Sequence, residues 1–201
     1  MNPNFKHILK KYPCLFILYA FLICNIIYIF ILNKSHFTAY AQNSTPITSY
    51  EELLKIKENP SGNYILMNDL DLSGKNWIPL TFTGTFDGNG HSILNVTIKE
   101  TGTVTRTSYD GNMKTYDTVF CGFFDILEEE AVVSNLNLIN IRADITCDTP
   151  CFIGGIAGYM DKSSIKDCTI SGNLSLKTTA NMFGVGGIAG FGNGTIDRML
   201  I

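Results

Sequence analysis

The chain has 201 residues, of which 45% are hydrophobic and 16% are charged, and its formal net charge is −3. This length is enough for one domain. All 18 acidic residues but only 11 of the 15 basic residues lie in residues 42–201, so this part carries a net charge of −7. An acidic surface of this kind repels phosphate backbones, which argues against nucleic acid as a partner.

Residues 1–41 have the features of an export segment. Three lysines precede an almost unbroken apolar run from Cys14 to Leu32. Nineteen residues at helical rise span about 28 Å, close to the thickness of a hydrocarbon core. A buried globular helix is disfavoured because the run has no polar face.

Two interpretations of this segment stay open. The small-x-small sequence Ala39-Tyr40-Ala41 fits a signal peptide cut after Ala41, whereas the length of the apolar run fits an uncleaved membrane anchor. In both, the leading lysines keep the N-terminus inside the cell. Everything after residue 41 is therefore expected outside the cell or on its surface.

The exported part is predicted to begin with a polar linker, residues 42–48, and a short helix. Ser49 and Glu52 have the spacing of a capping box, and Asn59-Pro60 ends the helical pattern, so an amphipathic helix is predicted over residues 50–58. From Tyr64 onward the apolar residues alternate with a period of two, which predicts β-strands.

Residues 49–201 repeat themselves. Four six-residue segments share the form aliphatic, any, Asn or Asp, apolar, any, apolar: Ile93–Ile98, Val133–Leu138, Ile165–Ile170 and Ile196–Ile201, with Arg198 replacing Asn or Asp in the last. A glycine-containing segment precedes each of them, and the last two of these segments are both GGIAG. One such unit cannot bury its apolar stripe alone, but stacked units can.

We therefore predict an all-β fold, a right-handed parallel β-helix (solenoid), with the helix at 50–58 capping its N-terminal end. Glycine is expected at corners, and the Asn and Asp residues are expected to stack as hydrogen-bonded ladders. An antiparallel sandwich or barrel is the alternative. It explains the alternation of apolar residues but not the recurrence of similar segments along the chain.

The same residues resemble a known family. The run Asn63–Gly74, then Trp77–Leu80, then Phe82–Ile93, together with Gly122–Asp125 and the GGIAG segments, resembles GLUG-motif repeat regions of bacterial surface proteins. The resemblance covers about residues 48–201. Such repeats occur in adhesin-like proteins and in the N-terminal region of IgA-specific metalloendopeptidases, and they usually accompany further repeats and domains. The resemblance implies a surface location and a chain that is part of a longer protein.

The catalytic centre of a zinc peptidase is not expected in this chain. Its histidines are His7, His36 and His91, and none lies in an H-E-x-x-H motif. If the chain belongs to such a peptidase, it is the non-catalytic accessory region.

A carbohydrate-active enzyme would need clustered carboxylates. Asp69, Asp71 and Asp87 with His91 form the best cluster in the sequence, and weak calcium binding is a further possibility there. Ordinary turn chemistry explains the same residues, because Asp87-Gly88-Asn89-Gly90 is a turn sequence. We predict no catalytic, cofactor-binding or metal-binding residue.

Four cysteines lie beyond the export segment, at positions 121, 147, 151 and 168. Cys147 and Cys151 flank Asp148-Thr149-Pro150 and either form a disulfide across this turn or remain separate thiols. No paired C-x2-C spacing supports a zinc site.

Binding to a protein or glycan of a host or cell surface is the leading functional hypothesis. Residues 101–118 interrupt the repeat and are predicted to form a surface loop that carries recognition, because tyrosine and arginine make good contact residues. The candidate ligand-binding residues are Arg106, Tyr109, Lys114 and Tyr116. Phe123 and Phe124 are predicted to lie in the core.

Overall fold

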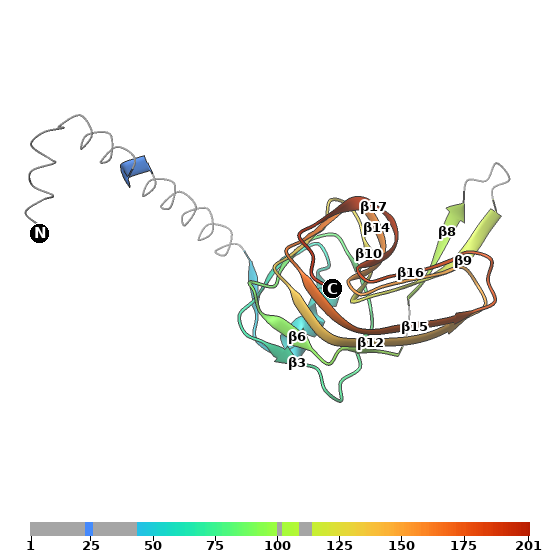
Figure 1. The fold of residues 1–201 in the computed structure, drawn as a ribbon, viewed down its shortest axis with the longest axis horizontal. Helices are drawn as coiled ribbons and strands as arrows, with labels where there is room; N and C mark the ends of the chain where they lie inside the picture. The colour runs from blue at the N-terminus through green and yellow to red at the C-terminus, as the bar shows by residue number, and fades with distance from the viewer. Residues whose placement is uncertain (1–22, 26–43, 100–101, 109–113) are drawn as a thin grey trace, which may run out of the picture. The chain divides into compact units, whose positions relative to one another are not determined.

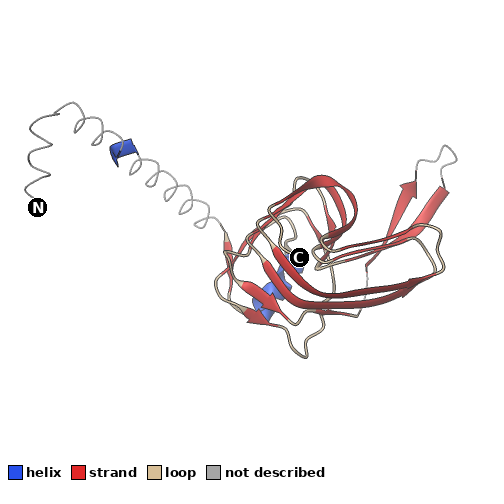
Figure 2. Ribbon diagram, viewed as in Figure 1, coloured by secondary structure: helices blue, strands red, loops and turns tan. Residues whose placement is uncertain are grey.

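The structure is a computed structural model that describes residues 23–25, 44–99, 102–108 and 114–201. The chain divides into two compact units, Met1–Asn43 and Ser44–Ile201. Almost all of the predicted signal or anchor segment lies outside the described residues, and residues 23–25 are helical. Within the part that the structure describes, no helix is long and apolar enough to cross a membrane. The second unit is mostly β-structure (Figure 2).

The helix predicted at the start of this unit is present in two parts. α3 spans Tyr50–Leu54 and the 3₁₀ helix η1 spans Lys55–Glu58. The Ser49 hydroxyl accepts a hydrogen bond from the Glu52 backbone N–H at 3.2 Å, as an N-cap residue should. The Glu52 carboxylate accepts one from the Thr48 backbone N–H at 2.7 Å, one residue earlier than the capping box predicts.

The predicted linker is not a free segment throughout. Strand β1 (Thr45–Ile47) lies within it and pairs in parallel with β2 (Asn63–Leu66). Ile47 is fully buried, and its core also contains Leu53 of α3 and Ile56 of η1. The apolar side of the helix thus packs on the N-terminal end of the β-structure.

The strands before residue 100, which we call the front strands, are short. They are β1, β2, β3 (Leu70–Asp71), β4 (Thr81–Phe82), β5 (Thr85–Asp87), β6 (Ser92–Leu94) and β7 (Thr97–Ile98). Tyr64 pairs with Phe86, and Leu70 pairs with Ile93. These partners are closer together in the sequence than the partners in the later strands.

The strands after residue 118 belong to three successive repeats of the chain, each of which lies on the one before it, and we call each repeat a layer. The first layer contains the end of β9 (Lys114–Cys121), β10 (Phe124–Leu127), β11 (Val132–Ser134) and β12 (Asn137–Cys147). The second contains β13 (Cys151–Gly154), β14 (Ala157–Lys166) and β15 (Thr169–Thr178), and the third contains β16 (Phe183–Gly186), β17 (Ala189–Asp197) and the residues up to Ile201. Val119 pairs with Cys151 and Cys151 with Phe183, so each layer adds one repeat of the sequence at a constant spacing.

The strands form three sheets. The largest has the order β1-β2-β5-β11-β14-β10-β4 with β17 also on β14; the second is β15-β12-β6-β3 with β7 on β12; the third is β16-β13-β9-β8. Among the described strands, every pair is parallel except β8 (Gly102–Ser108) with β9. The parallel strands curl into a half-barrel (Figure 1). Such pairing excludes the antiparallel sandwich.

Aromatic side chains fill the core where the front strands meet the first layer. Phe123 and Phe124 are fully buried, which confirms their predicted place. The Trp77 ring stacks on Phe123 with centroids 4.6 Å apart, and its Nε1–H donates to the Phe123 carbonyl at 2.6 Å. Phe82 stacks on Phe124 at 4.8 Å. This cluster ties the front strands to the first layer across the insertion between them.

The predicted alignment of the repeats is confirmed for three copies and wrong for the first. Val133 pairs with Ile165 and Ile165 with Ile196. Ile93, however, pairs with Leu138, so the segment that begins at Ile93 lies one corner further along the chain than its presumed equivalents. The pattern of an apolar residue, Asn and another apolar residue occurs at both corners. The sequence therefore suggested that all four segments occupy the same corner.

Asparagine and aspartate occupy the two corners in the left-handed conformation. Asn135, Asp167 and Arg198 share one corner with φ of 52°, 53° and 50°, and Asn95 and Asn140 share the other with φ of 58° each. At the second corner Asn140 donates its side-chain amide to the Asn95 side-chain oxygen at 2.7 Å, and Asn95 donates to Asp71 at 2.8 Å. The expected hydrogen-bonded ladder is thus present, in a different register.

The two GGIAG segments lie directly over one another, with Gly154 paired with Gly186 and Ala157 with Ala189. A Cβ on Gly154 would lie 2.1 Å from the Ala157 carbonyl oxygen, which no side chain can accommodate. Close approach of backbones, rather than a left-handed conformation, therefore explains the glycine at this position.

Candidate functional site

An antiparallel hairpin interrupts the parallel stack between the front strands and the first layer. β8 and β9 pair from Gly102 with Phe120 to Ser108 with Lys114. The hairpin extends beyond the neighbouring strands (Figure 1). β9 then continues into the third sheet, where Val119 pairs with Cys151.

Three of the four predicted binding residues lie on this hairpin. Arg106 and Tyr116 are directly paired across it, and Lys114 begins β9 opposite Ser108. Tyr109 lies outside the described residues. The prediction of a loop over residues 101–118 is wrong, because most of this segment forms two strands. Its threonine, valine and tyrosine residues favour strands and were the signal that could have revealed the hairpin.

The base of the hairpin is firmly packed. Phe120 is 3% exposed and its ring lies 5.8 Å from that of Phe152 and 5.2 Å from that of Tyr159. With Ile126 these residues form a second hydrophobic cluster, separate from the main core. The cluster fixes the end of β9 at the base of the hairpin, so the hairpin extends from a rigid support.

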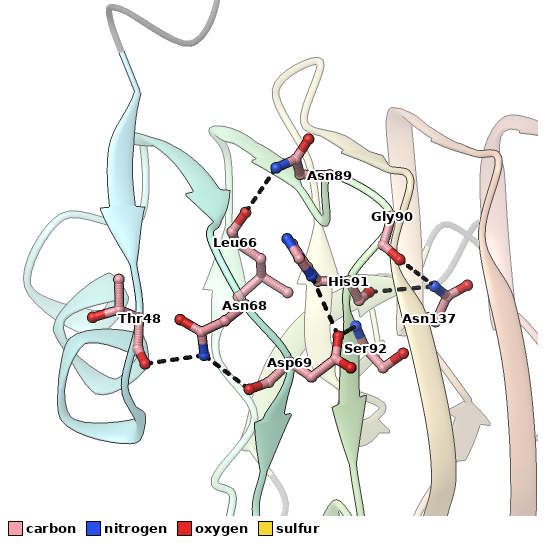
Figure 3. Close-up of polar contacts among 9 residues, drawn as sticks. All are labelled: Thr48, Leu66, Asn68, Asp69, Asn89, Gly90, His91, Ser92 and Asn137. Atoms are coloured by element: carbon pink, nitrogen blue, oxygen red, sulfur yellow. Dashed lines mark hydrogen bonds and ion pairs between the residues drawn. The ribbon is translucent and has the colours of Figure 1, made fainter.

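A second candidate region is the polar corner around Asp69 and His91 (Figure 3). The Asp69 carboxylate accepts a hydrogen bond from the Ser92 backbone N–H at 2.8 Å and lies 3.4 Å from His91 Nδ1. Asn137 donates to the Gly90 carbonyl at 2.9 Å. These contacts join successive strands, so their evident role is to hold the turns together.

The other two acids of the predicted cluster belong to different ladders. Asp71 accepts hydrogen bonds from Asn95 and from Ser73, and these bonds lower the pKa of its carboxyl group. Asp87 is 4% exposed and accepts from the Asn89 backbone N–H at 2.8 Å and from the Asn135 side chain at 2.9 Å. Each carboxylate thus has partners within the stack, and the three do not share one ladder.

The four cysteines of this unit are free thiols, and Cys147 is not joined to Cys151. Burial raises the pKa of Cys121 to about 12 and that of Cys168 to about 11. Burial, with the neighbouring Cys147 thiol as the next cause, also raises the pKa of Cys151. Among the described residues, no three or more His, Cys, Asp or Glu side chains are grouped as a metal site would require.

Comparison with known proteins gives no relative: no family model, curated protein or solved structure matches this chain. The resemblance to GLUG-motif repeats therefore stays a prediction that depends on the quoted residues alone.

Proposed function

We propose that this protein is an exported, non-catalytic surface module whose residues 49–201 form a right-handed parallel β-helix that presents the β8–β9 hairpin to a host or cell-surface protein or glycan. The observation that carries the proposal is the hairpin itself. It is the antiparallel exception among the described strand pairs, and in the sequence it lies between the front strands and the rest of the first layer.

Sequence spacing supports this separation. Phe86 pairs with Val133 across the segment that contains the hairpin. The sequence between these two partners is much longer than that between Val133 and its partner in the second layer, Ile165. Among the described strands, Gly102–Ser108 pair only with β9, so these inserted residues lie outside the parallel pairing of the stack. Recognition commonly depends on such additions to a rigid support.

The test shortens the hairpin without disturbing its base. Residues 106–116 are replaced by Asn-Gly, which joins the paired residues Thr105 and Asp117 through a two-residue turn. This removes all four predicted binding residues. The fluorescently labelled full chain in mild detergent is titrated onto a mucin-coated surface and onto a glycan array.

The wild-type chain should bind at least one of these surfaces, and the shortened chain should bind it at least about tenfold more weakly, as expected when central contact residues are lost. The control variant is His91→Ala at the polar corner, which should bind as the wild type does. Equal binding by the shortened and wild-type chains contradicts the proposal.

A further inference from the structure

Two thiols lie at the two ends of the turn that joins β12 to β13. β12 ends at Cys147 and β13 begins at Cys151, with Asp148-Thr149-Pro150 between them. Cys151 belongs to the main hydrophobic core, and Cys147 packs against that same core. The two side chains therefore lie on the same side of the turn, and the Cys147 thiol interacts directly with that of Cys151.

The two thiols differ in how well solvent reaches them. Cys151 is fully buried, whereas Cys147 is half-buried and lines an open cleft of about 420 Å³. The ends of the paired strands β12 and β15, with the residues that follow them, line this cleft: Thr146, Cys147, Asp148, Lys177, Thr178 and Thr179. A cleft of this size admits one end of a small molecule. A reagent in solution therefore reaches the Cys147 sulfur and not the Cys151 sulfur.

Acidity separates the two thiols in the same sense. Burial, followed by the neighbouring Cys147 thiol, raises the pKa of Cys151. A thiol attacks a disulfide only as its thiolate, so Cys151 is poorly suited to the first attack on an outside molecule. A covered thiol beside an accessible one is instead placed to react second, with a group that the accessible thiol has already captured.

We propose that Cys147 and Cys151 are a redox-active pair, which a small disulfide such as oxidised glutathione converts into an intramolecular disulfide across the turn. The Cys147 thiolate attacks one glutathione sulfur, which forms a mixed disulfide, breaks the glutathione S–S bond and releases one glutathione. The Cys151 sulfur, after losing its proton, attacks the Cys147 sulfur and releases the second glutathione. Two protein thiols are oxidised, one disulfide is reduced, and the two protein protons end on the two released glutathiones.

The new bond closes the turn that supports the base of the hairpin. The Pro150 carbonyl accepts a hydrogen bond from the Val119 backbone N–H at 2.8 Å, and Val119 pairs with Cys151. Oxidation therefore fixes the turn against which the end of β9 lies. The inference concerns thiol chemistry alone and does not depend on the binding function proposed above.

The test treats the reduced full chain in mild detergent with oxidised glutathione, unfolds it, blocks the remaining thiols with N-ethylmaleimide and maps its tryptic peptides by mass spectrometry. Trypsin cuts after Arg142 and Lys162, so residues 143–162 form one peptide that holds both cysteines of the pair and no other cysteine. In the treated wild type this peptide should be two hydrogen masses lighter and carry no maleimide. Cys121 and Cys168, each in a separate peptide, should both carry maleimide.

Three variants test the order of attack. Cys151→Ala should stop at the mixed disulfide and keep one glutathione on Cys147. Cys147→Ala should take up no glutathione on Cys151, because that thiol is fully buried. The matched control is Cys168→Ala, which removes a buried thiol outside the pair and should form the internal disulfide as the wild type does.

A treated wild-type peptide that still carries two maleimides overturns the proposal. So does a wild type that keeps glutathione on Cys147 without forming the internal bond, since the second thiol would then be unable to reach the first. A bond from either member of the pair to Cys121, the other thiol near Cys151, also overturns it. Glutathione on Cys151 in the Cys147→Ala variant would contradict the order in which the two thiols react.

Discussion

The two ends of the stacked unit differ in how well their apolar side chains are covered. At the N-terminal end the helix covers the core, and Ile47, Leu53 and Ile56 are fully buried. At the C-terminal end Ile196 and Val185 occupy positions equivalent to buried residues but are about half exposed. The comparison shows how much of the burial of each layer comes from the layer above it.

The largest expected effect is a difference between core truncations at the two ends. Leu53→Ala should lower the free energy of unfolding by about 2–5 kcal/mol, whereas Ile196→Ala should lower it by less than about 1 kcal/mol, because a half-exposed side chain leaves no closed cavity. Denaturant unfolding followed by the fluorescence of Trp77, the single tryptophan, measures both. Equal losses would mean that the third layer is as well covered as the helix end.

A matched pair of glycines sharpens the comparison. Gly155 donates its backbone N–H to the Gly187 carbonyl, so the two occupy equivalent places in adjacent layers. A Cβ on Gly155 would lie 2.5 Å from the Gly187 oxygen, whereas a Cβ on Gly187 would approach only side-chain atoms of Ile201, at 3.3 Å.

Gly155→Ala should therefore cost about 1–3 kcal/mol of stability, and Gly187→Ala should change it by less than about 0.5 kcal/mol. Thermal unfolding of the two variants gives the comparison. A large loss in Gly187→Ala would show that something covers this glycine.

The corner ladder provides a smaller test. Asn95 is left-handed, and its side chain is hydrogen-bonded to Asp71 on one side and to Asn140 on the other. Arg198 is also left-handed but lies in the third layer, where its side chain contacts Asp167 below it. Asn95→Ala should lower stability by about 1–2 kcal/mol, through strain at positive φ and the loss of both bonds. Asn95→Gly removes the strain and isolates the bonds, and Arg198→Ala should cost less than Asn95→Ala. If Asn95→Gly is as stable as wild type, the side-chain ladder contributes nothing.

The smallest expected effect concerns the buried Asp125, which is 5% exposed in the first layer. Burial raises the pKa of its carboxyl group. A folded-state pKa above the unfolded one means that Asp125 contributes most to stability when protonated, and that this contribution is lost as the pH rises through the folded-state pKa.

Asp125→Asn should therefore stabilise the protein at pH 7, and this gain should disappear at pH 3. Asparagine can keep both bonds of Asp125 Oδ1, which come from the Ile126 backbone N–H and the Thr81 hydroxyl. Melting temperatures at the two pH values test the sign. A gain that is equal at both would show that charge is not its cause.

Local chemistry made much of the fold predictable. The Ser49 cap, the burial of Phe123 and Phe124, and the stacking of Val133 on Ile165 all follow from patterns within one repeat. After Leu138 the apolar residues Ile139, Ile141, Ala143 and Ile145 alternate with the opposite parity in the sequence, and the left-handed Asn140 lies at a register shift in β12 there.

The position of the first repeat could not be read in the same way. Asn89 and Asn95 are both left-handed in the front strands, so two corners there carry similar sequences. Only the pairing of Ile93 with Leu138 shows which of the two corners Asn95 occupies. The hairpin was missed for another reason: residues 101–118 interrupt the repeat, which suggested a loop, while strand formation depended on the pairing of β8 with β9.

The parallel pairing described above also sets the order in which this protein can fold. Among the described strands, the parallel contacts join residues well separated in the sequence, from Thr45 with Tyr64 to Phe86 with Val133, whereas the strands of the hairpin are close together in the chain. The ribosome releases the helix-covered end first, and each later strand can then pair with strands that are already folded. Synthesis from N- to C-terminus thus matches the direction in which the structure can grow, and a circularly permuted chain that begins within the second layer should fold more slowly.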